Sequence, residues 1–307
     1  MLRMTENEIP SVYGHVTYTF NTFPRQIRLE SSSICNMACV PCHGHGANNK
    51  AVNNAKSMMR TKGRMPMEMF EAAIDEIATW DDPLREISPT NFGEWFMHPD
   101  WYEQGKMIEE RLPGTSISIP TTGVLINDQV LDRLVSLRAL RFVNFSVNAF
   151  FGETYEHFHG VPATHLPRVR KIVEEFKRRR PDIHVQVSMV YDPITQTEIE
   201  KQLFQAYWAP ITHVEINATS YCDHPSRRPD PPVVISCRSV FDGLVVFSDG
   251  RVGTGCCFDA DAELVVGHFP EQSLLEIWRG EPLRKLGETH NSGKRADLRL
   301  CKGCSFA

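Results

Sequence analysis

Short apolar runs alternate with longer amphipathic segments over the chain up to about residue 217. The runs are rich in isoleucine, valine and phenylalanine, and the segments between them carry apolar residues at helical spacing. This alternation is typical of parallel strands joined by helical crossovers. It predicts an α/β fold built on a partial (β/α)6 barrel, with strands at Gln26–Glu30, Arg85–Pro89, Thr115–Pro120, Arg141–Val147, Ile183–Val190 and His213–Asn217.

Helix signals stand between these predicted strands. Pro66 is predicted to open a helix in which Phe70 and Ile74 share one face. Asp128 is predicted to cap a second helix, and Val169–Arg180 is predicted to form a third. The helices therefore fall where the crossovers of a parallel sheet require them.

The pattern changes after residue 223. His224–Pro232 alternates prolines with charged residues and has nothing to bury, so we expect a linker there. Beyond it, Leu244–Phe247 and Arg251–Val252 flank an Asp-Gly turn and predict a hairpin, and Ser273–Leu286 predicts a helix. We therefore expect a small C-terminal domain made of a hairpin and a helix, and the following division: extension 1–24, barrel 25–223, linker 224–232 and C-terminal domain 233–307.

Composition narrows the class of protein. Hydrophobic residues make up 41% of the chain and charged residues 23%, which is ordinary for a folded globular protein. The start carries no secretory pattern, and no stretch approaches the roughly 18 apolar residues of a membrane span, so a cytoplasmic protein is expected. A net charge of -5 argues against a nucleic-acid binder and suits a cationic substrate. In a reducing compartment, nine cysteines are better candidates for metal ligands than for disulfides.

Three cysteines follow the first predicted strand at the spacing CxxxCxxC. We call Cys35, Cys39 and Cys42 the N-terminal cysteines. A loop at this place can bring three thiolates around one iron–sulfur cluster and leave one iron without a protein ligand. The spacing also allows a zinc knuckle that uses His43 or His45 as a fourth ligand.

The CxxxCxxC spacing resembles that of the radical S-adenosylmethionine (SAM) superfamily. The resemblance implies that the open iron of a [4Fe–4S] cluster binds SAM, and that the cluster, reduced by a flavodoxin or ferredoxin type of partner, cleaves SAM to a radical that abstracts hydrogen. Gly93 and Glu94 match half of the family's Gly-Gly-Glu-Pro turn, which meets the SAM amino group, whereas their neighbours depart from it. Thr122, Ser146 and Asn148 stand in segments similar to the family's polar strand ends and are expected to hold other parts of SAM.

Four further cysteines lie in the expected C-terminal domain. We call Cys237, Cys256, Cys301 and Cys304 the C-terminal cysteines. Their order around the predicted hairpin and helix resembles the shortened SPASM module, or twitch domain, of the superfamily. The resemblance implies a second [4Fe–4S] cluster with all corners occupied by protein, which would move electrons or shape the pocket. A structural zinc site with the same four thiolates is the alternative.

Cys257 is left over beside Cys256. Adjacent cysteines on a hairpin cannot easily both reach one cluster corner, so either residue is the ligand and the other a spare thiol. A spare thiol at the mouth of the barrel is a candidate catalytic hydrogen-atom donor, because its S–H bond is weak; it can also simply pack.

The reaction remains open among members that the chain resembles. Twitch-domain relatives include the 2-deoxy-scyllo-inosamine dehydrogenase, and similar cysteine layouts occur in aminoglycoside epimerases such as neomycin epimerase. A spare thiol favours an epimerase acting on a small aminoglycoside-type substrate. A dehydrogenase and an enzyme that modifies a ribosomal peptide are the alternatives. An electron carrier is the rival from another class, but it would need no SAM pocket.

Overall fold

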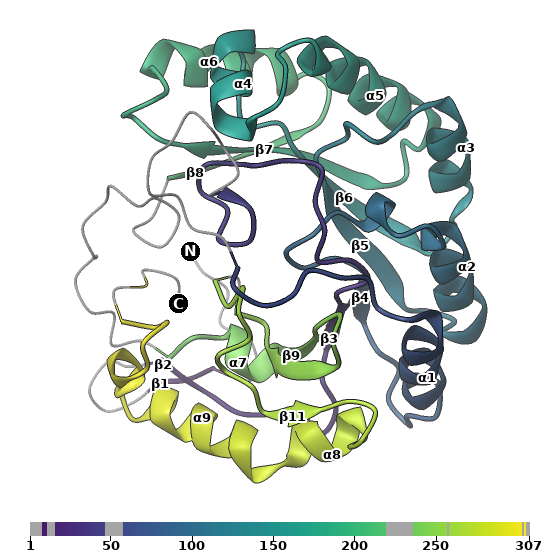
Figure 1. Cartoon of the computed structure of the whole chain (residues 1–307), viewed down its shortest axis with the longest axis vertical. Helices are drawn as coiled ribbons and strands as arrows, with labels where there is room; N and C mark the ends of the chain where they lie inside the picture. The colour runs from purple at the N-terminus through teal and green to yellow at the C-terminus, as the bar shows by residue number, and fades with distance from the viewer. Residues whose placement is uncertain are drawn as a thin grey trace.

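The structure is a computed structural model, and it describes residues 8–10, 16–46, 58–218, 236–256, 258–302 and 304. Nine strands of the described chain form one sheet in the order β11-β10-β9-β3-β4-β5-β6-β7-β8 (Figure 1). The run from β3 to β8 is parallel and follows the order of the chain. These strands confirm the predicted partial barrel at β3 (Gln26–Leu29), β4 (Glu86–Ser88), β5 (Ser116–Thr121), β6 (Leu140–Ser146), β7 (His184–Tyr191) and β8 (His213–Ala218).

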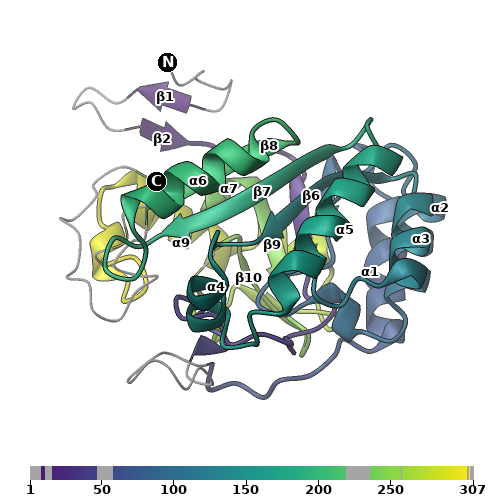
Figure 2. The same cartoon turned by 90° about the horizontal axis from the view of Figure 1, so that it is seen from above.

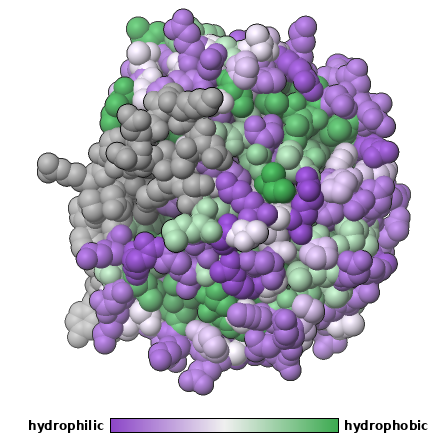
Figure 3. Space-filling model, in the orientation of Figure 1, coloured by the Kyte–Doolittle hydropathy of each residue, from purple (hydrophilic) through white to green (hydrophobic). Residues whose placement is uncertain are grey.

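Helices cover the outer face of this sheet (Figures 1 and 2). Each barrel strand points alternate side chains outward, and the outward residues, such as Ile27, Ile87 and Val143, are fully buried. The helices that pack on them do so through apolar stripes, and their outer faces are hydrophilic along the rim of the molecule seen in Figure 3. The covering helices are α1 (Met67–Ala78), α2 (Trp101–Arg111), α3 (Asp128–Ser136), α5 (His165–Arg179) and α6 (Glu198–Trp208). No helix in the described ranges has both the length and the apolar character needed to cross a bilayer.

Two of the helix predictions need correction. The cap of α3 is Asn127, whose side chain accepts a hydrogen bond from the backbone N–H of Val130 at 2.9 Å, and the expected cap, Asp128, is the first helical residue. The single helix expected over Ser273–Leu286 is two helices, α8 (Leu274–Arg279) and α9 (Glu281–Asn291). Gly280 between them has extended backbone, and a proline at the start of α9 cannot continue the preceding helix.

The C-terminal strands extend the barrel sheet. The predicted hairpin is present as β9 (Gly243–Val246) and β10 (Arg251–Thr254), and β11 (Gly267–His268) adds a third antiparallel strand. The turn uses Gly250 in the left-handed region, with φ of 87°. Strand β9 pairs in parallel with β3, so the hairpin continues the sheet on the first barrel strand. The expected linker, residues 224–232, lies outside the described residues.

The expected N-terminal extension contains structure that the sequence pattern did not predict. β1 (Glu8–Pro10) and β2 (Val16–Tyr18) form a two-stranded antiparallel sheet. Asn291, at the end of α9, accepts from the backbone N–H of Tyr18 at 3.1 Å and donates to its carbonyl at 2.8 Å. The indole N–H of Trp278 donates to the carbonyl of Asn21 at 2.9 Å. The start of the described chain is thus held against the C-terminal helices.

Candidate active site

The N-terminal cysteines lie in a loop that leaves β3 at the carboxyl end of the barrel. The backbone N–H of Ala38 donates to the carbonyl of His159 at 2.9 Å, and that of Val40 donates to the carbonyl of Phe158 at 2.8 Å. Both acceptors belong to the last turn of α4 (Gly152–His159), whose final carbonyls lack partners within the helix. The loop is therefore fastened to the end of a helix more than a hundred residues away in sequence.

The three thiols are neighbours. Burial, together with the charges of Glu94 and Cys42, raises the pKa of Cys35 to about 12. Burial also raises the pKa of Cys39, followed by the charges of Cys42 and Cys35. Among the described residues no three His, Cys, Asp or Glu side chains converge as the ligands of a single metal ion. A cluster does not require such convergence, because each of its irons takes a separate thiolate.

His159 contacts one of these thiols and was not predicted from the sequence. Its Nδ1 atom lies 3.0 Å from Cys39 Sγ and its Nε2 atom lies 3.0 Å from the carbonyl of Val147. The ring is fully buried, and burial lowers its pKa to about 4. A carbonyl only accepts, so Nε2 carries the proton in the neutral ring and Nδ1 faces the sulfur.

The turn after β4 places Gly93 and Glu94 against the cysteine loop. A Cβ at Gly93 would lie 1.9 Å from the carbonyl oxygen of Ser32, so only glycine fits there. The backbone N–H of Glu94 donates to the carbonyl of Ile34 at 3.0 Å. The match to the family turn at Gly93 therefore has a direct steric reason in this chain.

The carboxylate of Glu94 has one satisfied and one orphaned oxygen. Oε2 accepts from the Thr121 hydroxyl and from the backbone N–H of Thr122, each at 3.0 Å. Oε1 is buried and has no hydrogen-bond partner. Burial raises the pKa of Glu94 to about 7. A buried acceptor without a donor, next to the cysteine loop, fits an incoming ammonium group such as that of SAM.

The other polar residues expected to hold SAM are placed differently. Thr122 joins Glu94, whereas Asn148 lies at the far side of the β6 end, in the left-handed region with φ of 58°. The Asn148 side chain accepts from the backbone N–H of Val190 at 2.8 Å, which ties it to β7. Ser146 is the last residue of β6 and pairs with Ser188. The roles of all three residues toward SAM stay predictions.

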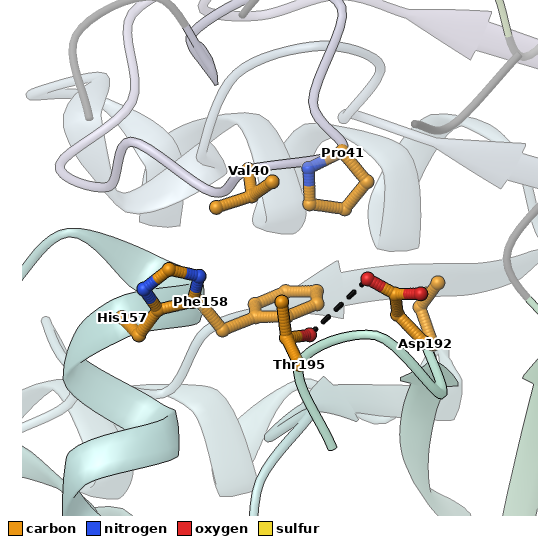
Figure 4. Close-up of a pocket in the computed structure, with 7 residues that line it drawn as sticks. Val40, Pro41, His157, Phe158, Asp192 and Thr195 are labelled. Atoms are coloured by element: carbon orange, nitrogen blue, oxygen red, sulfur yellow. Dashed lines mark hydrogen bonds between the residues drawn. The ribbon is translucent and has the colours of Figure 1, made fainter. Parts of the chain in front are cut away.

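A small apolar slot lies among side chains of the cysteine loop, α4 and the end of β7 (Figure 4). Val40 and Pro41 face Phe158 across it, and Asp192 accepts from the hydroxyl of Thr195 at 3.2 Å on its floor. Its volume of about 10 Å³ is enough for about one water molecule. A planar aromatic ring of a ligand would fit into this slot only if Val40 and Pro41 moved away from Phe158.

A larger cavity lies on the inner face of the barrel strands. It has a volume of about 400 Å³, and most of the residues that line it are polar. They reach it because alternate residues of β3 to β6 point inward. Ser118 donates to Oε1 of Glu86 at 2.8 Å within it. The cavity is lined by Arg28, Glu86, Ser88, Thr90, Asn91, Ser118, Ile119, Pro120, Phe142 and Asn144. Its size suits a small polar molecule.

The fold gathers the C-terminal cysteines. Burial raises the pKa of Cys301 to about 12; the charge of Arg295 opposes this rise, whereas those of Cys237 and Cys304 add to it. Cys256 packs against a small cluster formed by Phe258 and Cys304. Cys257, the candidate hydrogen donor, lies outside the described residues.

His290 and Arg295 support this group, and neither was predicted to do so. Nδ1 of His290 accepts from the backbone N–H of Cys237 at 3.3 Å, and its Nε2 lies 3.7 Å from Cys301 Sγ. The guanidinium of Arg295 is buried and donates to the carbonyl of Cys304 at 3.0 Å. A histidine near the last cysteines is the one signal in the sequence that would have directed attention to this position.

A buried ion pair links the two cysteine regions. Arg60 donates to Glu30 at 2.6 Å, with side-chain exposures of 3% and 0%. Arg60 also donates to the carbonyl of Ala260 at 2.5 Å. The second oxygen of Glu30 accepts from the backbone N–H of Ser248 at 3.1 Å. The end of β3, the segment after the cysteine loop and the C-terminal hairpin are thereby held together.

Comparison with known families agrees with this geometry. The Radical SAM superfamily model matches residues 29–205, more than half of the chain, and the protein therefore belongs to that superfamily. The model of SPASM, an iron-sulfur cluster-binding domain, matches residues 237–305. Together they imply SAM, a [4Fe–4S] cluster and further iron–sulfur clusters. That the N-terminal and C-terminal cysteines hold these clusters, in preference to zinc, stays a prediction. The all-sulfur donor sets and the orphaned oxygen of Glu94 fit these groups.

Individual relatives are more distant. The AdoMet-dependent heme synthase of Methanosarcina barkeri is 25% identical over 139 residues, which are 45% of this chain and 35% of that protein. The chain thus matches only about a third of that relative.

Solved structures share the fold. BtrN in complex with AdoMet and 2-DOIA has a TM-score of 0.61 at 16% identity and 94% coverage of both chains. Streptococcus suis SuiB bound to precursor peptide SuiA has a TM-score of 0.66 at 14% identity, covering 93% of this chain and 72% of SuiB. For anSMEcpe with bound AdoMet the values are 0.67 and 14%, with coverages of 91% and 85%. The TM-scores show a common fold.

Proposed function

We propose that this radical SAM enzyme abstracts a hydrogen atom from a carbon of a small amino sugar or carbinol, and that it epimerises an aminoglycoside-type compound. The observation that supports a small substrate is the cavity of about 400 Å³ on the inner face of the barrel. Its walls belong to the same sheet from whose carboxyl end the loop with the N-terminal cysteines leaves. When bound, the reduced cluster and SAM supply the means of removing hydrogen from an unactivated carbon.

The chain's own residues have separate tasks in this proposal. The orphaned oxygen of Glu94 accepts from the ammonium group of SAM, while Thr121 and Thr122 hold the other oxygen in place. The loop and α4 leave the thiols half-buried and so limit the access of water to them. The inner face of β3 to β6 binds the substrate through hydrogen bonds.

The epimerase outcome rests on the thiol of Cys257. Cys256 packs against the cluster formed by Phe258 and Cys304, which supports Cys256 as the cluster ligand and leaves its neighbour spare. In the final step the S–H bond of Cys257 breaks and a C–H bond forms on the opposite face of the substrate carbon. One electron from a flavodoxin or ferredoxin type of reductant and one proton from solvent then restore the thiol.

The test separates the two half-reactions. Reconstituted Cys257→Ala protein, given SAM, dithionite and a candidate aminoglycoside, should still release 5′-deoxyadenosine but form little inverted product. Wild type in deuterated water should place one deuterium at the inverted carbon, because thiol hydrogens exchange with solvent. Cys222, the remaining one of the nine cysteines, belongs to neither group of predicted ligands. Cys222→Ala is therefore the matched control and should behave as wild type.

A dehydrogenase is the second candidate. The structure of BtrN with AdoMet and 2-DOIA, which matches over 94% of both chains, supports a small ligand for either reaction. An oxidised product two mass units lighter, formed equally by wild type and by Cys257→Ala, would establish this reading and exclude the thiol from the reaction. SuiB bound to a precursor peptide keeps a peptide substrate as the third alternative.

A further inference from the structure

Two opposite charges face the barrel cavity from neighbouring strands. Arg28 of β3 pairs in register with Ser88 of β4, and Glu86 of β4 pairs with Gln26 of β3. Because residues two apart on a strand share a face, Arg28 and Glu86 both point to the inner side, and both line the cavity. They are diagonal neighbours on that face, because one residue pair, Ile27 with Ile87, lies between them in the register.

These charges do not neutralise each other. No ion pair within 4.0 Å joins Arg28 to Glu86, and Arg28 has no carboxylate partner among the described residues. Glu86 accepts a single hydrogen bond, from the hydroxyl of Ser118. Both side chains are partly buried, and a charge withdrawn from water is costly unless it is paired or hydrogen-bonded.

A second cavity offers a comparison within the same molecule. It lies beside Glu109, Arg138 and Arg141 at the opposite ends of the strands. There Glu109 is already saturated, by Lys106 at 2.7 Å and by the backbone N–H groups of Arg138 and Ala139. The charges in the barrel cavity differ because they retain hydrogen-bonding capacity that faces the open space.

We propose that Arg28 and Glu86 form a subsite that selects an amino alcohol, with an ammonium group on Glu86 and a hydroxyl oxygen on Arg28. This assignment rests on the proposed function, in which the cavity holds a small polar substrate. Ser118 and Asn144 line the space with neutral hydrogen-bonding groups, which match hydroxyls better than a second charge. The subsite holds the part of the substrate away from the reacting carbon.

The experiment uses four ring compounds that differ only in their substituents. They are trans-4-aminocyclohexanol, cyclohexylamine, cyclohexane-1,4-diol and trans-4-aminocyclohexanecarboxylate, titrated into the reconstituted enzyme with SAM and followed by calorimetry. Wild type should bind the amino alcohol about tenfold more tightly than the amine or the diol, since each added charged hydrogen bond contributes about that factor. Tighter binding of the amino acid would overturn the assignment to amino alcohols.

Variants identify the residues responsible. Glu86→Gln should weaken binding of the amino alcohol about tenfold and leave the diol unchanged, and Arg28→Gln should weaken the amino alcohol and leave cyclohexylamine unchanged. Glu103→Gln, exposed on α2, is the control for removing one carboxylate. Equal binding by wild type and Glu86→Gln, with iron content preserved, would overturn the subsite.

The binding experiment tests the subsite separately from the proposed epimerase reaction. Release of 5′-deoxyadenosine without substrate reports on the SAM site alone, and it should be the same in wild type and both cavity variants. Wild type that cleaves SAM but binds none of the four compounds would overturn the subsite and leave the radical SAM activity standing. Wild type that binds the amino alcohol but inverts no substrate would support the subsite and overturn the proposed epimerase activity.

Discussion

The Nδ1 atom of His159 lies 3.0 Å from Cys39 Sγ, and the other ring nitrogen lies 3.0 Å from the carbonyl of Val147. One imidazole thus connects the cysteine loop to the segment just after β6. The connection is made in full burial, where a lost hydrogen bond is not replaced by water. It gives the loop a fixed position relative to the barrel end.

Replacement of His159 should loosen the N-terminal cysteines. We expect His159→Ala to lower the free energy of unfolding by about 1–3 kcal/mol, because it leaves buried partners unsatisfied, and to reduce the iron retained after anaerobic reconstitution and gel filtration. His268→Ala, exposed on β11, is the control and should retain wild-type iron. Equal iron in both variants would show that the contact does not support the cluster.

Replacement of the N-terminal cysteines should remove only the iron that they bind. The triple variant Cys35→Ala, Cys39→Ala, Cys42→Ala should keep about half of the iron, because the C-terminal cysteines retain theirs, and should release no 5′-deoxyadenosine. Iron by absorption spectroscopy and nucleoside release by chromatography measure the two effects. SAM cleavage at the wild-type rate would contradict the assignment of this site.

Glu94 should make stability depend on pH. Burial raises its pKa in the folded protein to about 7, from an ordinary value of 4.5, so the folded state binds the proton more tightly than the unfolded state. This contribution is complete below about pH 4.5 and is lost as pH rises through about 7. Relative to Glu94→Gln, SAM-free wild type should therefore lose on the order of 2–3 kcal/mol between pH 5 and pH 8. A pH-independent difference between the two proteins in denaturant titrations would refute this origin.

The same substitution should weaken SAM binding. Glutamine keeps the hydrogen bonds from Thr121 and Thr122 but replaces a carboxylate facing an ammonium group by a neutral oxygen. We expect about a tenfold rise in the dissociation constant for SAM at pH 8, measured by equilibrium dialysis with the reconstituted enzyme. Glu103→Gln serves again as the control, and an unchanged constant in Glu94→Gln would remove Glu94 from the SAM site.

Loss of one C-terminal cysteine should affect its surroundings. Cys301→Ala removes a thiol close to Cys237 and Cys304, so iron content should fall and the C-terminal segment should become sensitive to protease. SAM-independent spectra of the N-terminal site should persist. One tightly bound zinc in wild type, absent from this variant, would instead identify a zinc site.

Local signals determined much of the barrel. The six parallel strands were predictable because a strand alternates outward and inward residues over consecutive positions of the sequence. The CxxxCxxC spacing and the Asp-Gly turn are local sequence patterns as well. Gly93 was found through its neighbours in sequence, and the structure supplies the reason in the carbonyl of Ser32. The expected single helix over Ser273–Leu286 was wrong. Apolar residues continue at helical spacing on both sides of Gly280, and this pattern hides the break between the two helices.

Contacts between distant segments were decided only by the tertiary structure. The sequence placed Cys39 in a predicted metal-binding loop, but gave no sign of His159 beside it. It placed Arg60 and Glu30 in separate segments, and gave no sign of their buried ion pair. It likewise gave no sign that β9 pairs with β3. Such partners share no spacing that a pattern can reveal, because the closing of the sheet and the packing of α4 on the loop bring them together. The sequence by itself therefore determined the barrel strands and the residues predicted to carry the chemistry, and the packing of the elements determined which residues meet.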